Sequence, residues 1–159
     1  MYKRQNLEHG TACYNYGISL EQGSGGSVDK DGAHDAYKKG CNLEYGAACY
    51  NYGIFLSQGR GGSVDKDGAR GAYRKGCDLE HGTACNNYGG FLQNGRGGSV
   101  DEDGAREAYR KGCDLEDGTA CKSYGIFLEN GRGGSVDKDG ARDAYRKGCL
   151  LYTSPSPRD

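Results

Sequence analysis

Eight cysteines recur at fixed intervals, and they are the residues whose type and spacing could support chemistry. The two series advance in steps of 36 residues: Cys13, Cys49, Cys85 and Cys121, and Cys41, Cys77, Cys113 and Cys149. Thiols form disulfides, bind metal ions or act as redox nucleophiles. Which of these roles the thiols have depends on their spacing and on the secondary-structure elements that position them.

Disulfide pairing is open on the residues alone. One pattern joins cysteines eight residues apart and leaves Cys13 and Cys149 without partners: Cys41–Cys49, Cys77–Cys85 and Cys113–Cys121. A second pattern uses all eight thiols at a separation of 28 residues: Cys13–Cys41, Cys49–Cys77, Cys85–Cys113 and Cys121–Cys149. Free structural thiols in a reducing compartment are a third alternative.

Metal binding and catalysis are not favoured. Zinc ligands usually come in pairs about two to four residues apart, and no two cysteines lie that close. The three histidines, His9, His34 and His81, do not recur with the repeat. Cysteines eight apart also differ from the redox-active C-x-x-C motif. We therefore predict no catalytic residues, no metal and no cofactor.

Two short motifs favour structural roles. "VDKDG" (Val28–Gly32) resembles part of a calcium loop, but Ser27 and Lys38 stand where acidic ligands are needed, so helix capping is the better interpretation. "GRGG" begins at Gly59, Gly95 and Gly131 and predicts a glycine-rich turn carrying a solvated arginine.

The repeat predicts two helices in each unit. In residues 31–41, small and aromatic residues recur at helical spacing on one face, with Asp29 or Asp31 as the N-cap. Residues 10–23 carry a second such stripe, which ends at Gly23. These stripes consist of Gly, Ala, Cys and Tyr, so two backbones can approach closely while tyrosine rings fill the space beside them. The fold class is therefore all-α.

Composition sets further limits. The 159 residues carry a net charge of -1, and only 35% are hydrophobic, with 30 glycines and 13 tyrosines. Such balanced charge does not favour nucleic acid as a partner, and no apolar run predicts a membrane span. A core this thin favours cross-linking.

The unit "KGCDLEHGTACNNYGGFLQNGRGGSVDEDGAREAYRKGC" (Lys75–Cys113) resembles the Sel1-like repeat, in its cysteine-rich branch. The matching positions are Cys77, Cys85, Tyr88, Gly89, Gly95, Gly97, Val100, Asp103, Ala105, Tyr109 and Cys113. A two-residue "GS" insertion and Gly112 depart from the family pattern. The resemblance implies αα-hairpins stacked in a right-handed superhelix, as in tetratricopeptide arrays. It also implies disulfides between cysteines eight apart, with Cys13 and Cys149 left over.

The chain divides into an array and a tail. We predict a repeat array over 1–149, with a partial repeat at 1–41 and repeats at 42–77, 78–113 and 114–149. "LLYTSPSPRD" (150–159) has no counterpart in the repeats and resembles a translated sequencing adaptor. We therefore expect a fragment of a longer array, without a signal peptide of its own.

One column of residues is predicted to contact a partner. The tyrosines at 16, 52, 88 and 124 and at 37, 73, 109 and 145 are expected in the core. Positions that differ between near-identical copies are expected to be exposed, and one such column lies in register along the first helix of each unit: Tyr14, Tyr50, Asn86 and Lys122. Solenoids present such a surface as a concave groove.

The favoured function is a non-enzymatic scaffold that binds a protein or peptide. We expect the scaffold to be a monomer in an oxidising compartment. That compartment is the extracellular space, the periplasm, the endoplasmic reticulum or the mitochondrial intermembrane space. Two alternatives rest on the resemblance alone. One is the β-lactamase-like activity attributed to the cysteine-rich branch, although no S-x-x-K motif occurs. The other is haem or copper handling, as in a respiratory-complex assembly factor.

Overall fold

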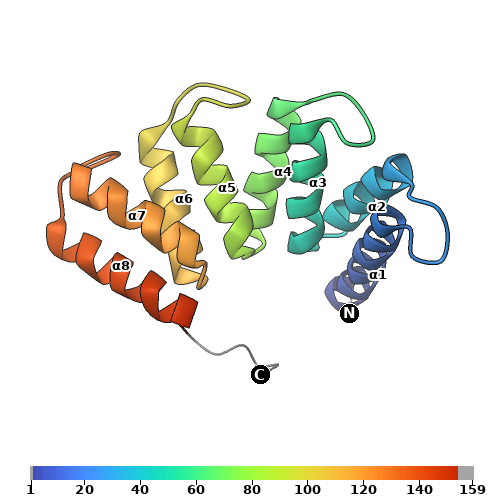
Figure 1. The fold of residues 1–159 in the computed structure, drawn as a ribbon, viewed down its shortest axis with the longest axis horizontal. Coiled ribbons are helices and arrows are strands. Elements are labelled where there is room, and N and C mark those ends of the chain that lie inside the picture. Colours follow the sequence, from blue (N-terminus) through green and yellow to red (C-terminus); the bar gives the residue numbers. More distant parts are fainter. Residues whose placement is uncertain (1, 154–159) are drawn as a thin grey trace.

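The chain forms an array of helical hairpins. The computed structural model describes residues 2–153, which form eight helices and no strand. The helices are α1 (Tyr2–Gln22), α2 (Lys30–Asn42), α3 (Gly46–Gln58), α4 (Lys66–Asp78), α5 (Gly82–Gln93), α6 (Glu102–Asp114), α7 (Gly118–Asn130) and α8 (Lys138–Thr153). Successive helices pair into four hairpins, which stack side by side in an arc with their long loops along its outer edge (Figure 1). The predicted αα-hairpin solenoid is confirmed.

The "VDKDG" motif starts the second helix of each hairpin. In the second unit, Asp65 lies in extended conformation before α4, and its Oδ1 accepts a hydrogen bond from the backbone N–H of Gly68 at 2.8 Å. Asp29 caps α2 in the same way. This bond satisfies one of the amide donors left free at a helix N-terminus. The capping interpretation of the motif is therefore confirmed.

The first and last helices are longer than predicted. We expected the first helix to begin at residue 10, but α1 begins at Tyr2, and α8 continues past Cys149 to Thr153. Between hairpins, the chain leaves the helix at Glu44, Glu80 and Glu116, whose φ angles lie between 63° and 66°. Such a left-handed residue stops a helix, and none occurs within α1 or α8. Residues 154–159 of the predicted tail lie outside the described residues.

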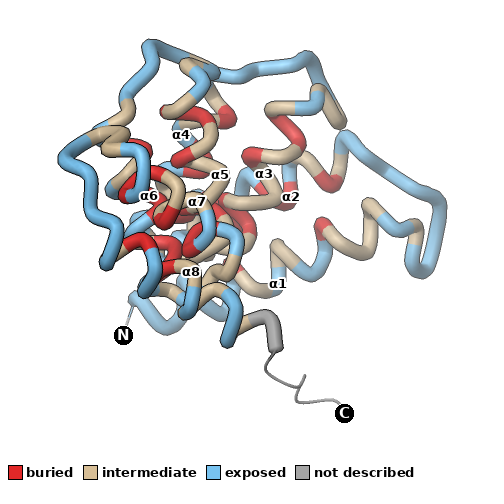
Figure 2. The backbone as a smooth tube through the Cα atoms, turned by 60° about the vertical axis from the view of Figure 1, so that its left-hand side comes forward, coloured by how far each residue is buried: buried red, intermediate tan, exposed pale blue. Residues whose placement is uncertain are grey.

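Small residues allow the helices to pack closely, as the sequence indicated. A Cβ on Gly53 would lie 2.6 Å from Cε1 of Tyr73, within one hairpin. A Cβ on Gly76 would lie 2.8 Å from the Cβ of Ala84, across the junction between hairpins. Both distances are below van der Waals contact, so these positions require glycine. Buried residues gather where helices face one another, and the loops are exposed (Figure 2).

The tyrosine prediction holds for three residues of one series, in which Tyr145 is only half-buried, and it fails in part for the other series. Tyr37, Tyr73 and Tyr109 are buried. Tyr16, however, is 61% exposed, while Tyr52 is half-buried against the ring of His34 at a centroid distance of 5.3 Å. That contact comes from the preceding hairpin. No described residue supplies an equivalent hairpin before α1, so Tyr16 remains open to solvent.

Candidate functional site

Three disulfides join consecutive hairpins, and each links cysteines eight residues apart. Cys77 lies in the last turn of α4 and Cys85 in the first turn of α5, with their Cα atoms 4.4 Å apart. The other two bridges repeat this arrangement at Cys41–Cys49 and Cys113–Cys121. All six cysteines are buried. The solenoid is therefore stapled by disulfides, and the pairing at 28 residues does not occur among the six bridged cysteines.

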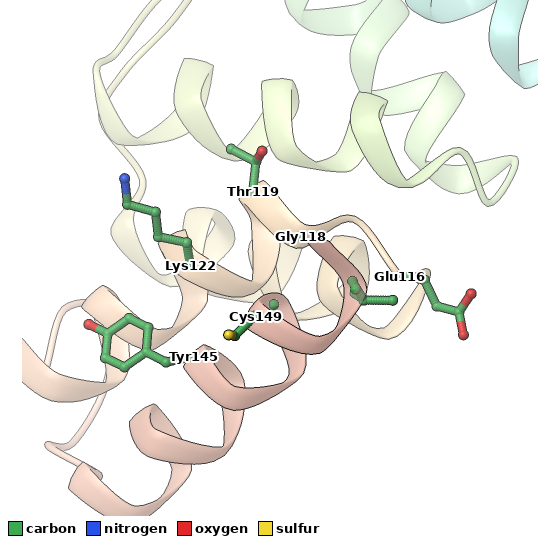
Figure 3. Close-up of a pocket in the computed structure, with 8 residues that line it drawn as sticks. Glu116, Gly118, Thr119, Lys122, Tyr145 and Cys149 are labelled. Atoms are coloured by element: carbon green, nitrogen blue, oxygen red, sulfur yellow. The ribbon is translucent and has the colours of Figure 1, made fainter. Parts of the chain in front are cut away.

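The two remaining cysteines lie on the outer hairpins. Cys13 is a half-buried free thiol on α1. Cys149 is exposed on α8, where it lines a hollow of about 510 Å³ between α7 and α8. Figure 3 shows Lys122 on α7 and Tyr145 and Cys149 on α8 around this hollow. Within residues 2–153, no three or more His, Cys, Asp and Glu side chains are grouped so that they could hold a metal ion.

A second hollow, of about 460 Å³, lies over α3 and α5 in the middle of the array. We call it the central hollow. Its lining comes from five helices and the loop after α5: Tyr50, Ile54, Ser57, Gln58, Tyr73, Asn86, Asn87, Gly90, Phe91, Asn94, Arg96, Tyr109 and Ser123. The lining is rich in amides and hydroxyls, and Arg96 is its one charged residue. It offers hydrogen bonds and a single positive charge.

The column of residues predicted to contact a partner does not lie along one hollow. Tyr50 and Asn86 line the central hollow, Lys122 lines the hollow beside α8, and Tyr14 lines none of the hollows described here. Only Lys122 is fully exposed, and the other three are half-buried. The expectation that the whole column is exposed is therefore wrong. Aromatic packing explains the burial, because Tyr14 contacts the ring of Tyr45 at 5.4 Å.

Burial also changes the acidity of Tyr50. Its ring stacks on His81 at 5.2 Å and lies 6.1 Å from the ring of Tyr73. Loss of solvent raises the pKa of the Tyr50 hydroxyl, and the nearby Tyr73 and Asp117 raise it further against an opposing hydrogen bond from Asn87. Tyr50 is therefore a neutral hydroxyl at physiological pH, suited to hydrogen bonding.

The arginines of the "GRGG" turns stack on aromatic rings, and Arg60 and Arg132 are half-buried while Arg96 is exposed. The guanidinium groups of Arg60, Arg96 and Arg132 lie 4.3 to 4.4 Å from the ring centroids of phenylalanines five residues earlier. Stacking on an aromatic face favours a cation and restricts its motion. The prediction of a solvated arginine in this turn therefore holds for Arg96 and is wrong for Arg60 and Arg132, and in all three turns the ring orients the guanidinium group.

Sequence reasoning missed the most informative residues of the central hollow. Ser57 lies in a column of positions that vary between copies, together with Glu21, Gln93 and Glu129. The structure shows what that column does. The hydroxyl of Tyr37 donates a hydrogen bond to Glu21 at 2.7 Å, and corresponding bonds occur in the third and fourth hairpins. The spacing of 16 residues between each tyrosine and its acceptor was the available signal.

Solved structures share this architecture. A Sel1 repeat protein from Oxalobacter formigenes superposes with a TM-score of 0.83 at 25% identity, over 89% of this chain and 58% of that protein. The chain folds as a Sel1-like repeat array. A protective antigen of uropathogenic Escherichia coli, c5321, matches with a TM-score of 0.82 at 23% identity, over 94% of this chain and 32% of that protein. The array thus spans between a third and three fifths of these two proteins.

A cysteine-rich protein of known structure is also similar to this chain. Helicobacter pylori cysteine rich protein B matches with a TM-score of 0.61 at 25% identity, over 76% of this chain and 92% of that protein. No protein-family model and no curated sequence matches the chain. No described helix is long and apolar enough to cross a membrane. The three disulfides, together with this likeness, fit an oxidising compartment.

Proposed function

We propose that this Sel1-like repeat array is a protein-interaction scaffold that binds an extended peptide segment in the central hollow and has no catalysis of its own. The observation that carries the proposal is the central hollow itself: a polar recess of about 460 Å³ in the middle of the array, rich in side-chain amides and hydroxyls. Such groups can bond the main chain of a peptide, while rigid aromatic residues such as Tyr50 supply contact area.

The construction of the array supports this role. Each disulfide joins the end of one hairpin to the start of the next, so the junctions that shape the hollow are covalently fixed. A surface that is rigid before binding loses less conformational entropy when a ligand docks. We further propose an oxidising location, because these bridges persist only where thiols are not reduced.

Selection of random short peptides on the oxidised protein tests the proposal. The perturbing variant is Gly90→Ile, which fills the hollow with the residue found at the equivalent positions Ile18, Ile54 and Ile126. We expect the fold to tolerate it, because the other units carry isoleucine here and a Cβ at Gly90 would meet only the Tyr109 hydroxyl, 3.8 Å away.

Peptides bound in the hollow should lose affinity by about tenfold or more in Gly90→Ile. The matched control, Lys38→Gln, changes an exposed residue on α2 and should leave affinity unchanged. Peptides that bind both variants as well as the unaltered protein, or selections that yield no binder, would contradict the proposal.

A further inference from the structure

The first two hairpins contain a complete carboxylate site. One oxygen of the Glu21 carboxylate accepts the hydroxyl of Tyr37 at 2.7 Å, and the other accepts Nη2 of Arg60 at 2.6 Å. The Arg60 guanidinium is held in place over the ring of Phe55 at 4.4 Å. A buried tyrosine and a stacked arginine thus grip one acidic side chain from two sides.

The same site recurs one unit later without its acid. Tyr73 and Arg96 occupy the positions of Tyr37 and Arg60, and Arg96 is stacked over Phe91 at 4.3 Å. At the position of Glu21, however, the chain carries Ser57. Within residues 2–153, no carboxylate pairs with Arg96 and no group hydrogen-bonds the hydroxyl of Tyr73. Two donors therefore remain without their acceptor.

The next site, formed by the third and fourth hairpins, has an acid for its arginine. Arg132 is paired with Glu102, whose Oε1 accepts Nη2 at 2.8 Å. The residue equivalent to Glu102 in the preceding unit is Lys66, whose positive charge cannot form an ion pair with Arg96. Of these three stacked arginines, Arg96 alone has no carboxylate from the described residues.

The space beside Arg96 is suited to an incoming side chain. Ser57 and Gly90 both line the central hollow, where the equivalent positions one unit earlier carry the larger Glu21 and Ile54. The lining residues include no acid, so nothing in the hollow repels an anion. The missing group is a carboxylate.

We propose that Tyr73 and Arg96 bind the carboxylate of a glutamate or aspartate side chain in an extended segment of a partner protein. This proposal rests on the proposed function and adds the chemistry of the ligand. The bound acid takes the place that Glu21 fills in the first unit, with one oxygen on the Tyr73 hydroxyl and the other on the Arg96 guanidinium. Asn86 and Asn87, in the same lining, lie where they can bond the adjacent main chain.

A small probe tests the carboxylate site directly. The capped peptide acetyl-Gly-Glu-Gly-amide is titrated into labelled protein while the side-chain N–H signals of the arginines are followed by NMR. We expect the Arg96 signal to move and the Arg132 signal to stay, because Arg132 already holds Glu102. The glutamine version of the peptide should leave both signals in place. Equal shifts with the two peptides would overturn the proposal.

The variant Ser57→Glu is the matched control, since it restores the acid that Glu21 supplies in the first unit. It should fold as the unaltered protein and abolish the response of Arg96 to the probe. Arg96→Gln should abolish probe binding as well. Retention of probe binding in Ser57→Glu would overturn the proposal.

The peptides selected for the proposed function separate the two claims. They should share an acidic residue at one fixed position and weaken by about tenfold when it becomes an amide or when Ser57 becomes glutamate. Peptides that lose affinity in Gly90→Ile but share no acid would overturn the acidic-ligand proposal and leave peptide binding intact. A requirement for a free peptide C-terminus would also overturn it, because the carboxylate would then be terminal.

Discussion

Removing one bridge should loosen the middle of the array. In the double variant Cys77→Ala with Cys85→Ala, the short loop between α4 and α5 is no longer closed covalently. Closing a loop of this size contributes about 2.5 kcal/mol through the entropy of the unfolded chain. The side chains are also 4% and 0% exposed, so the two lost sulphurs together remove packing contacts valued at about 1.5 kcal/mol. The total loss of unfolding free energy is about 4 kcal/mol.

Hydrogen exchange measures this loss where it occurs. Solenoid units are stabilised by their neighbours, so the effect should be concentrated in α4 and α5. A change of about 4 kcal/mol lowers amide protection there by about three orders of magnitude, while α7 and α8 change less. The control Cys13→Ala alters a thiol outside the three bridges. Unchanged protection in α4 and α5 of the double variant would refute the reasoning.

Three further perturbations follow from single contacts. Gly53→Ala forces a Cβ against Tyr73 and should lower the free energy of unfolding in urea by about 1–3 kcal/mol. Gly71→Ala places its Cβ in open space and should raise that free energy by about 0.5–1 kcal/mol. Equal effects of the two variants would contradict the packing account. Asp65→Ala removes the cap of α4 and should cost about 1 kcal/mol by thermal unfolding, and no loss would exclude capping. His81 accepts the N–H of Ala84 through Nδ1, and burial lowers its pKa, although nearby Asp117 opposes this. As the pH drops, His81 binds a proton in the unfolded chain before it does so in the folded chain. The free energy of unfolding should therefore fall below about pH 6.5, and His81→Asn should lessen that fall.

Local sequence patterns predicted much of the fold. The capping aspartates act within three residues, and the glycine stripes act between adjacent helices, so both are visible in the period of 36 residues. The lengths of α1 and α8 were not predictable in this way. Their ends depend on the absence of a left-handed residue such as Glu80, which lies between hairpins.

The central hollow depends on contacts that no local pattern encodes. Arg60 reaches Glu21 across 39 residues, and this contact exists only because neighbouring hairpins stack in one register. Variation between copies identified the column containing Tyr50 but gave no measure of its burial. Variation between copies also identified position 57. Its role becomes clear only from the structure, which shows that Tyr73 and Arg96 occupy the positions of Tyr37 and Arg60. The pattern marked single positions of the hollow, such as Tyr50 and Ser57, and the packing supplied their chemistry.

The connectivity of the cysteines tests most directly whether consecutive hairpins are stapled. Each of the three closed loops contains one exposed glutamate, such as Glu80 between Cys77 and Cys85. Cleavage after glutamate without reductant should cut this loop while leaving the Cys77 and Cys85 peptides joined, with a combined mass that separates on reduction. Peptides joined instead as Cys85–Cys113 would contradict the account, because the bridges would then lie within hairpins rather than between them.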